Sequence, residues 1–271
     1  MATKKAVSKS VKTSAKKPTV AAKTSTVNAV RATSGNTLVN TILQKAPFIG
    51  TLVAEFIGTF LLATAFITGQ GQPIIVMFAI AGVVLLVGAL SGAHINPAVT
   101  IASWLSRRIS GLRALGYIAA QFLGALAALG LLHAFIGGAP ALDANAQLYG
   151  QTAPSLFEVA KLPAGKEWYV FFSELVGSLV LGFTMATALR GKRDRVASAL
   201  TVGFGVFIAL LLAATAASYV SGSAVLNPAV ALSLNGLKWE VWPLAVYVLA
   251  PVIGAVGGFF LQDLVRVEND N

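Results

Sequence analysis

Six apolar segments, each long enough to cross a lipid bilayer, constrain this chain of 271 residues most strongly. A helix needs about 20 residues to cross the hydrocarbon core, and lipid cannot satisfy the polar groups of an unpaired backbone. Only 11% of the residues are charged, well below the ~25% that is typical of soluble domains. We therefore predict an all-α membrane protein with spans near residues 48–69, 73–92, 113–137, 167–190, 196–218 and 240–262.

The distribution of basic residues predicts how these spans are oriented. Arginines cluster in the connections after the second and the fourth predicted span, and residues 1–45 hold nine Lys or Arg and no acidic residue. With six spans, all three basic segments fall on one side of the membrane, which the positive-inside rule identifies as the cytoplasm. We therefore expect a multi-pass integral protein of the cell membrane with both termini cytoplasmic.

Residues 1–45 differ in composition from the rest of the chain. They are rich in Lys, Ser, Thr, Ala and Val without helical or strand periodicity, so they cannot bury enough apolar surface to offset the entropy of ordering. We predict a disordered basic tail that anionic lipid headgroups attract; organelle targeting and nucleic-acid binding by the tail are the alternatives. The rest of the chain carries eleven bases and ten acids. We expect no nucleic-acid partner for the membrane domain, residues 46–266, which precedes a short C-terminal tail, 267–271.

The chain also contains an internal repeat. The heptapeptide AEFIGTF that begins at Ala54 is echoed 119 residues later by SELVGSL, which aligns Glu55 with Glu174. The phrases NPAVT and NPAVA likewise recur at an offset of 131 residues. Because each half contains three spans, the second half enters the membrane inverted, and functional sites in inverted repeats lie near the bilayer midplane. We set the two repeats at residues 46–138 and 166–266.

Each repeat contains one Asn-Pro-Ala box, and the two boxes are Asn96-Pro97-Ala98 and Asn227-Pro228-Ala229. Each box opens an apolar segment of ten residues, 96–105 and 227–236. Ten helical residues rise about 15 Å, which is half of the hydrocarbon core. Asn is a favoured N-cap, and Pro is favoured at the first helical position. We predict two half-helices whose N-termini meet near the midplane, where the Asn amides donate hydrogen bonds and the positive helix ends repel cations.

These features together resemble the aquaporin (major intrinsic protein) family over residues 48–264. The paired boxes, the phrase SGAHINPAVT and the repeated glutamates carry the resemblance. It implies an all-α membrane fold of six transmembrane helices and two re-entrant half-helices in an inverted 3+3 repeat, usually assembled as a homotetramer. It also implies a passive pore in each protomer for water or small uncharged solutes.

The resemblance further assigns roles to individual residues. Both boxes line the pore, and the family's loop-bracing positions match Glu55, Glu174 and His94. Its four-residue selectivity filter matches Val76, Thr215, Ala224 and Val230. Ala214 is the alternative to Thr215, because one additional residue separates Ser221 from the second box when the two repeats are aligned.

This filter lacks the large aromatic residue, the His and the Arg that are typical of water-selective members. Val230 stands at the position of the Arg, and Ala231 stands where glycerol facilitators usually carry Asp. We therefore expect a wider pore that passes water together with small neutral solutes such as glycerol, urea, ammonia or hydrogen peroxide. Ion exclusion would then rest on the Asn pair and the half-helix dipoles.

Other function classes fit the sequence less well. A secondary transporter also uses inverted repeats, but the spans hold few ionisable groups besides Glu55 and Glu174 that could couple to an ion gradient. A non-conducting structural or junctional protein is the other alternative. We expect no enzyme, catalytic residue, cofactor or metal, because no nucleophile–base set, phosphate loop or metal-ligand spacing is present and the chain has no Cys.

Overall fold

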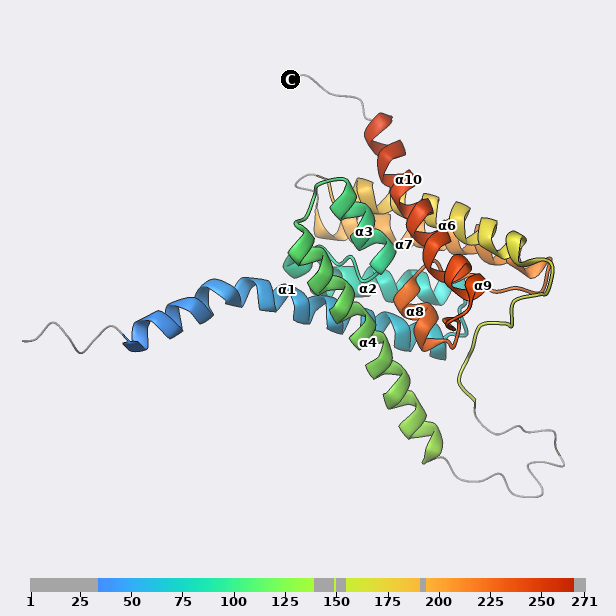
Figure 1. Ribbon diagram of the computed structural model, residues 1–271, viewed down its shortest axis with the longest axis horizontal. Coiled ribbons are helices and arrows are strands. Elements are labelled where there is room, and N and C mark those ends of the chain that lie inside the picture. Colours follow the sequence, from blue (N-terminus) through green and yellow to red (C-terminus); the bar gives the residue numbers. More distant parts are fainter. Residues whose placement is uncertain (1–33, 139–148, 150–154, 191–193, 266–271) are drawn as a thin grey trace, which may run out of the picture. The chain divides into compact units, whose positions relative to one another are not determined.

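The computed structural model describes residues 34–138, 149, 155–190 and 194–265, with side chains from residue 47 onward (Figure 1). The chain divides into two compact units, residues 1–44 and 45–271. All side chains that the structure describes belong to the second unit. Most of the predicted basic tail and the whole predicted C-terminal tail, 267–271, lie outside the described residues.

Six helices are long and apolar enough to cross a membrane. The first and last residues of each apolar part lie within two positions of those predicted for the corresponding span. Their apolar parts are Pro47–Thr68, Pro73–Ser91, Gly111–Gly137, Glu167–Ala188, Arg195–Ser218 and Val241–Leu264. Five of these belong to α1 (Ser34–Thr68), α2 (Pro73–Ser91), α4 (Gly111–Gly137), α6 (Glu167–Ala188) and α7 (Arg195–Ser218). The sixth is built from α9 (Val241–Leu244), the π-helical turn η1 (Ala245–Leu249) and α10 (Ala250–Leu264). Among the described residues there is no strand.

Helix α1 begins earlier than the sequence suggested. The expected irregular tail extends to residue 45, yet the helix starts at Ser34 and continues through Pro47. Adding residues to an existing helix costs far less than nucleating a new one, so the membrane-length helix extends toward the N-terminus. Pro47 removes one backbone hydrogen bond without ending the helix.

Two short helices interrupt the bundle at the positions predicted for the half-helices. They are α3 (Pro97–Leu105) and α8 (Pro228–Ser233). Helix α8 is shorter than the expected ten-residue segment because Asn235 adopts a left-handed conformation (φ 56°) and the Gly236 N–H donates to the Ala231 carbonyl at 2.8 Å. The left-handed residue and this hydrogen bond together form a Schellman motif, which terminates many helices.

The two ends of the bundle are identified by contacts between distant segments. At one end, the Gly71 turn between α1 and α2 lies against the ring of Phe157. At the other end, Arg108, which follows α3, donates to the Ala186 carbonyl of α6 at 3.1 Å and to Asp263 of α10 at 3.0 Å. We refer to these as the Gly71 end and the Arg108 end.

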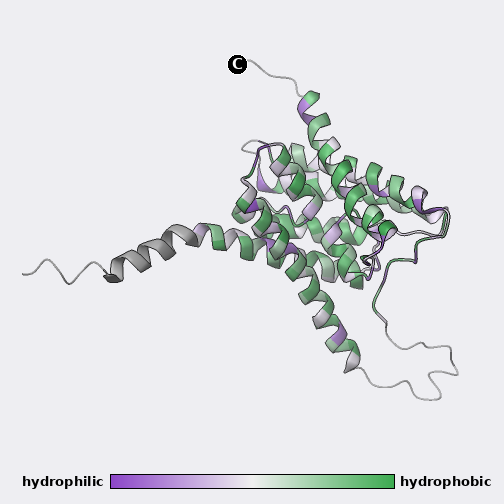
Figure 2. Cartoon of the chain, viewed as in Figure 1, coloured by the Kyte–Doolittle hydropathy of each residue, from purple (hydrophilic) through white to green (hydrophobic). Residues whose placement is uncertain are grey.

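Apolar residues dominate the long helices along their length (Figure 2). Large side chains such as Phe78, Leu112 and Phe135 are exposed on the outside of the unit. A helix that is hydrophobic all round is buried either in a large protein or in a membrane. The exposed apolar surface therefore fits a lipid environment.

Helices α6 and α10 cross at very short distance. A Cβ atom at Gly254 would overlap the Leu175 carbonyl, one at Gly258 would overlap the Leu179 carbonyl, and one at Gly182 would overlap the Ala255 carbonyl. Small residues permit such close approach of helix backbones, which is how membrane helices gain packing energy. This crossing fixes the core of the second repeat.

Candidate pore

Asn96 and Asn227 cap the two half-helices through their side-chain oxygens. The Oδ1 atom of Asn96 accepts from the Ala98 N–H at 2.8 Å, and that of Asn227 accepts from the Ala229 and Val230 N–H groups at 3.0 and 3.3 Å. In both cases Pro occupies the first helical position, where a missing N–H costs nothing. The capping predicted from the sequence is present in both repeats.

The same two amides join the repeats to each other. Asn96 Nδ2 donates to the Leu226 carbonyl at 2.8 Å, and Asn227 Nδ2 donates to the Ile95 carbonyl at 2.9 Å. Each bond therefore runs from one half-helix cap to the residue that precedes the opposite cap. An amide NH₂ has two N–H groups, so this exchange uses one and leaves one for a molecule in the lumen. The sequence pattern gave no sign of this reciprocal bond.

Two buried glutamates hold the loops that lead into the half-helices. Glu55 Oε1 and Oε2 accept from the His94 and Ile95 N–H groups at 2.9 and 2.6 Å. Glu174 Oε1 and Oε2 accept from the Val225 and Leu226 N–H groups at 2.6 and 2.9 Å, so the two loops are braced in the same way. Both glutamates are fully buried.

The braced loops contain residues in strained backbone conformations. Ile95 and Leu226, each directly before a box, have φ values of 41° and 61°. Such left-handed conformations are uncommon for residues other than Gly, and for a β-branched residue such as Ile95 they are outliers. Strained residues persist only where the surroundings over-determine them. Here a glutamate carboxylate accepts from the N–H of each of these two residues, and the amide of the opposite Asn donates to its carbonyl.

His94 lies beside a polar network that, among the residues the structure describes, belongs to the first repeat. Thr100 Oγ1 lies 3.3 Å from His94 Nδ1, and Gln121 Nε2 donates both to Thr100 Oγ1 at 2.9 Å and to Glu55 Oε2 at 2.7 Å. The His94 ring also makes an edge contact with Tyr117. Gln121 was not identified from the sequence, although a glutamine within an apolar span is the kind of signal that marks such a residue.

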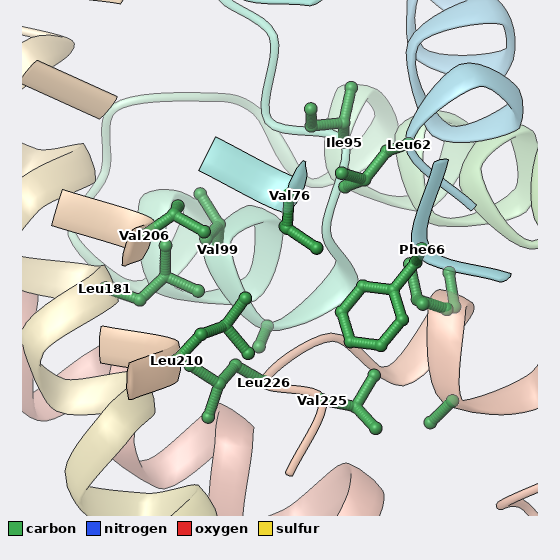
Figure 3. Close-up of a cluster of buried hydrophobic side chains, with 14 of the residues drawn as sticks. Leu62, Phe66, Val76, Ile95, Val99, Leu181, Val206, Leu210, Val225 and Leu226 are labelled. Carbon is green, nitrogen blue, oxygen red and sulfur yellow. The ribbon is translucent and has the colours of Figure 1, made fainter. Parts of the chain in front are cut away.

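A narrow cavity of ≈ 30 Å³ lies where the two boxes meet. About 10–15 Å³ of such space holds the centre of one water molecule, so the cavity has room for roughly two waters. Figure 3 shows Phe66 of α1, Val76 of α2 and Leu210 of α7 pointing into the same region. Asn96, Asn227 and His94 supply the polar side chains of its lining. Phe66 and the surrounding aliphatic side chains make this cavity narrow at the level of the boxes. The wider pore expected from the missing Arg and aromatic filter residues stays a prediction.

The four predicted filter residues occupy different environments. Val76 and Val230 line the cavity and are buried. Ala224 is buried without being part of the cavity lining, and the Thr215 side of α7 is exposed. Ala214, the alternative position, packs against the apolar core.

Charged side chains gather at the Arg108 end, away from the cavity. Asp263 pairs with both Arg108 and Arg190, and the Arg108 guanidinium also lies over the Phe259 ring at 4.7 Å. Partial burial lowers the pKa of Arg108 from its ordinary value. These contacts tie the segment after α3 to α6 and α10.

Among the described residues, no group of three His, Cys, Asp or Glu side chains is arranged to hold a metal ion.

Comparison with known proteins gives a consistent result. The model of the major intrinsic protein family matches residues 42–261. Aquaporin NIP1-1 of Zea mays is 31% identical over 241 residues, which cover 84% of this chain and 79% of the relative. Glycerol uptake facilitator protein-like 6 of Lactiplantibacillus plantarum is 30% identical over 83% of this chain and 98% of its own length. The solved structure of the aquaglyceroporin from Plasmodium falciparum superimposes with a TM-score of 0.59 at 23% identity, covering 80% of this chain and 96% of that one.

Proposed function

Because this chain belongs to the major intrinsic protein family, we propose that it conducts water and small uncharged solutes passively and excludes ions where its two half-helices meet. The observation that carries this proposal is the reciprocal pair of bonds from Asn96 to Leu226 and from Asn227 to Ile95 beside the central cavity. The pair fixes two N–H donors and two helix N-termini around one narrow passage.

The electrostatics of this junction support ion exclusion. Both half-helices direct their N-termini, which carry partial positive charge, toward the cavity. The carbonyls of Ile95 and Leu226, the nearest acceptors before each box, are already bonded to the Asn amides. A cation entering the lumen would lose its hydration shell and meet N–H donors instead of oxygen ligands.

We assign the selectivity filter to Val76, Ala214, Ala224 and Val230. Ala214 replaces Thr215 in this assignment because Ala214 packs on the core whereas Thr215 is exposed. In α7 it also follows Leu210, which lines the cavity, by one helical turn. Glu55, Glu174 and His94 act as loop braces in this proposal and do not contact the permeating molecule as acids or bases.

Assembly and orientation complete the proposal. We expect a homotetramer in the cell membrane, each protomer with its own pore, and both termini in the cytoplasm. This places the Arg108 end, with its paired arginines, on the cytoplasmic side, in line with the positive-inside rule. The basic N-terminal segment would then face the anionic lipid headgroups of the inner leaflet.

The test is stopped-flow light scattering on proteoliposomes of the purified full chain. A channel raises water permeability with low activation energy and without dependence on an H⁺ or Na⁺ gradient. A panel of glycerol, urea, ammonia and hydrogen peroxide then defines the solutes. Absence of any protein-dependent flux, or flux that requires an ion gradient, would refute the proposal.

Ion exclusion is tested separately by Asn227→Asp. The aspartate keeps the oxygen that caps α8 but loses the donor to Ile95 and adds a negative charge beside the lumen. We expect a cation conductance in planar bilayers that the parent lacks. A parent that itself carries substantial ion current would show that the junction does not exclude ions.

A further inference from the structure

A second cavity of ≈ 260 Å³ lies between α2, α6 and α7, toward the Arg108 end, where α6 ends and α7 begins. We call it the Arg195 cavity, because its lining includes Arg195 at the first position of α7. Arg195 Nη2 donates to the Leu85 carbonyl at 2.9 Å, so the guanidinium reaches from α7 to α2. With Ser198 as a second polar side chain, this space is larger and more polar at its rim than a single-file passage and holds many waters.

The Arg195 cavity and the central cavity lie along the same helix faces. On α2 and on α7, residues four positions apart pass from one lining into the other, namely Val76, Ile80, Val84 and Gly88 on α2 and Ser198, Val202, Val206 and Leu210 on α7. Residues at this spacing share one face of a helix. The two cavities are therefore successive chambers along one line between the boxes and the Arg108 end.

Met185 of α6 separates the two chambers. It belongs to both linings, and among the described residues it is the only one that they share. Its side chain is 2% exposed, so it fills the space between the chambers instead of lining an open channel. A molecule that travels from the boxes to the Arg108 end must therefore pass the Met185 side chain.

A methionine at this position has a property that an aliphatic residue lacks. Its side chain is unbranched and has several rotatable bonds, so it adapts to irregular space. Leu181, one turn earlier on α6, is branched and lines the central cavity alone. The Arg195 cavity gives Met185 space to turn into without displacing other atoms of the protein.

We propose that Met185 forms a second constriction of the pore, at which a movable side chain turns aside for each molecule that passes. The inference rests on the proposed channel function and adds a size-determining residue to it, one that acts separately from the predicted filter at Val230. Solutes larger than water require a larger displacement of Met185, so its bulk lowers their permeability more than that of water.

The first test removes this bulk. Met185→Ala is compared with Met77→Ala, because Met77 is also buried but lies outside both linings and faces Gly203 of α7. Water and glycerol permeability are measured in the same proteoliposomes, and folding is checked by circular dichroism and gel filtration. We expect Met185→Ala to raise the glycerol-to-water permeability ratio by about fivefold or more, the lower end of what relief of steric overpacking supplies. An unchanged ratio, or an equal rise in Met77→Ala, would overturn the inference.

The second test locates the constriction without relying on flux. The chain has no Cys, so Met185→Cys, Ser198→Cys and Met77→Cys each carry a single thiol. Sealed vesicles of both orientations are treated with the membrane-impermeant anion sulfonatoethyl methanethiosulfonate, and labelling is measured by mass spectrometry. Ser198→Cys, in the lining of the Arg195 cavity, marks the side from which the reagent enters that chamber.

We expect Met185→Cys to react from the same side as Ser198→Cys and not from the other, because the central cavity of ≈ 30 Å³ is too narrow for the reagent. Met77→Cys should react from neither side. Reaction of Met185→Cys from the opposite side, from both sides or from neither would overturn the inference. A parent without any flux whose Met185→Cys variant still reacts from one side would instead refute the proposed function.

Discussion

The two repeats hold equivalent half-helices with the same glutamate contacts, but they differ in what surrounds each glutamate. In the first repeat, Glu55 bonds two backbone N–H groups and is itself held by Gln121, which also contacts Thr100. In the second repeat, Glu174 bonds the two corresponding N–H groups, and the residue aligned with Gln121 is Pro251. Within the described parts of the two repeats, the polar network is thus confined to the first.

Helix backbones approach closely in both repeats: a Cβ atom at Gly124 of α4 would overlap the Phe56 carbonyl of α1, just as one at the aligned Gly254 would overlap the Leu175 carbonyl. The second repeat extends this close packing further along its helices. Gly182 and Gly258 lie at the close crossing of α6 and α10, whereas the aligned residues of the first repeat are Ala63 and Ala128, both fully buried. The second repeat therefore has the longer stretch of close contact between two helix backbones. The comparison shows that the same loop geometry is kept with different amounts of side-chain hydrogen bonding and of close helix packing around it.

The largest expected effect distinguishes the two glutamates. Glu174→Ala leaves two buried N–H groups without acceptors, which costs about 2–6 kcal/mol at about 1–3 kcal/mol per group. Glu55→Ala costs less, by about 1 kcal/mol or more, because Gln121 Oε1, which has no partner in the parent, can turn toward one orphaned N–H. The free energy of unfolding by SDS titration measures both. Equal losses would show that Gln121 gives no compensation.

Adding one methyl group to the second-repeat crossing gives the next effect. Gly258→Ala places a Cβ atom against the Leu179 carbonyl, and backbone cannot yield as a side chain does. We expect a loss of about 1–3 kcal/mol in unfolding free energy. Gly257→Ala is the matched control, because its Cβ would meet only the Leu179 side chain at 3.8 Å. If both variants were equally stable, the two helix backbones would not be in close contact at this crossing.

Removal of the first-repeat network is expected to be milder. Gln121→Met keeps the volume of the buried side chain but deletes its bonds to Glu55 and Thr100. Glu55 retains both backbone N–H donors, so the loss should be about 1 kcal/mol. Thermal unfolding in detergent measures it, together with water permeability, which should be nearly retained. A loss as large as that of Glu55→Ala would mean that Gln121 is the principal brace.

The smallest effect is expected at the Arg108 end. Asp263→Asn removes the negative partner of Arg108 and Arg190. The Asp263 side chain is partly exposed to solvent. Partly exposed ion pairs contribute about 0–1 kcal/mol, and salt screens them. The difference in melting temperature between parent and variant should therefore shrink at high ionic strength. A difference independent of salt would indicate a packing role for Asp263 instead of an ionic one.

Much of this architecture was predictable from local sequence signals. The six spans, the positions of the half-helices and the Asn caps follow from apolar length, the Asn-Pro pair and the repeat offset, all of which act within a few residues. The start of α1 was predicted too late, because extension of a helix depends on cooperativity more than on composition. The length of α8 was overestimated because a left-handed Asn235 is not distinguishable from a helical Asn by its identity.

The features that depend on distant segments were not visible in the sequence. The reciprocal bonds of Asn96 and Asn227 join residues 130 and 132 positions apart, and Gln121 reaches Glu55 across 66 positions. Phe66 and its aliphatic neighbours converge on the central cavity from several helices, a packing that the absence of an Arg at Val230 does not reveal. Space inside a bundle depends on which side chains the fold brings together, and a motif does not contain that information.

By itself, the sequence determined that this protein is an inverted repeat of membrane-length helices with two capped half-helices. It could do so because helix length, capping and backbone satisfaction in lipid are set by residues adjacent in the chain. Only the tertiary structure decided how polar and how wide the passage is. Those properties arise where six segments from both repeats meet, and the outcome there depends on packing and on which hydrogen-bonding groups are already occupied.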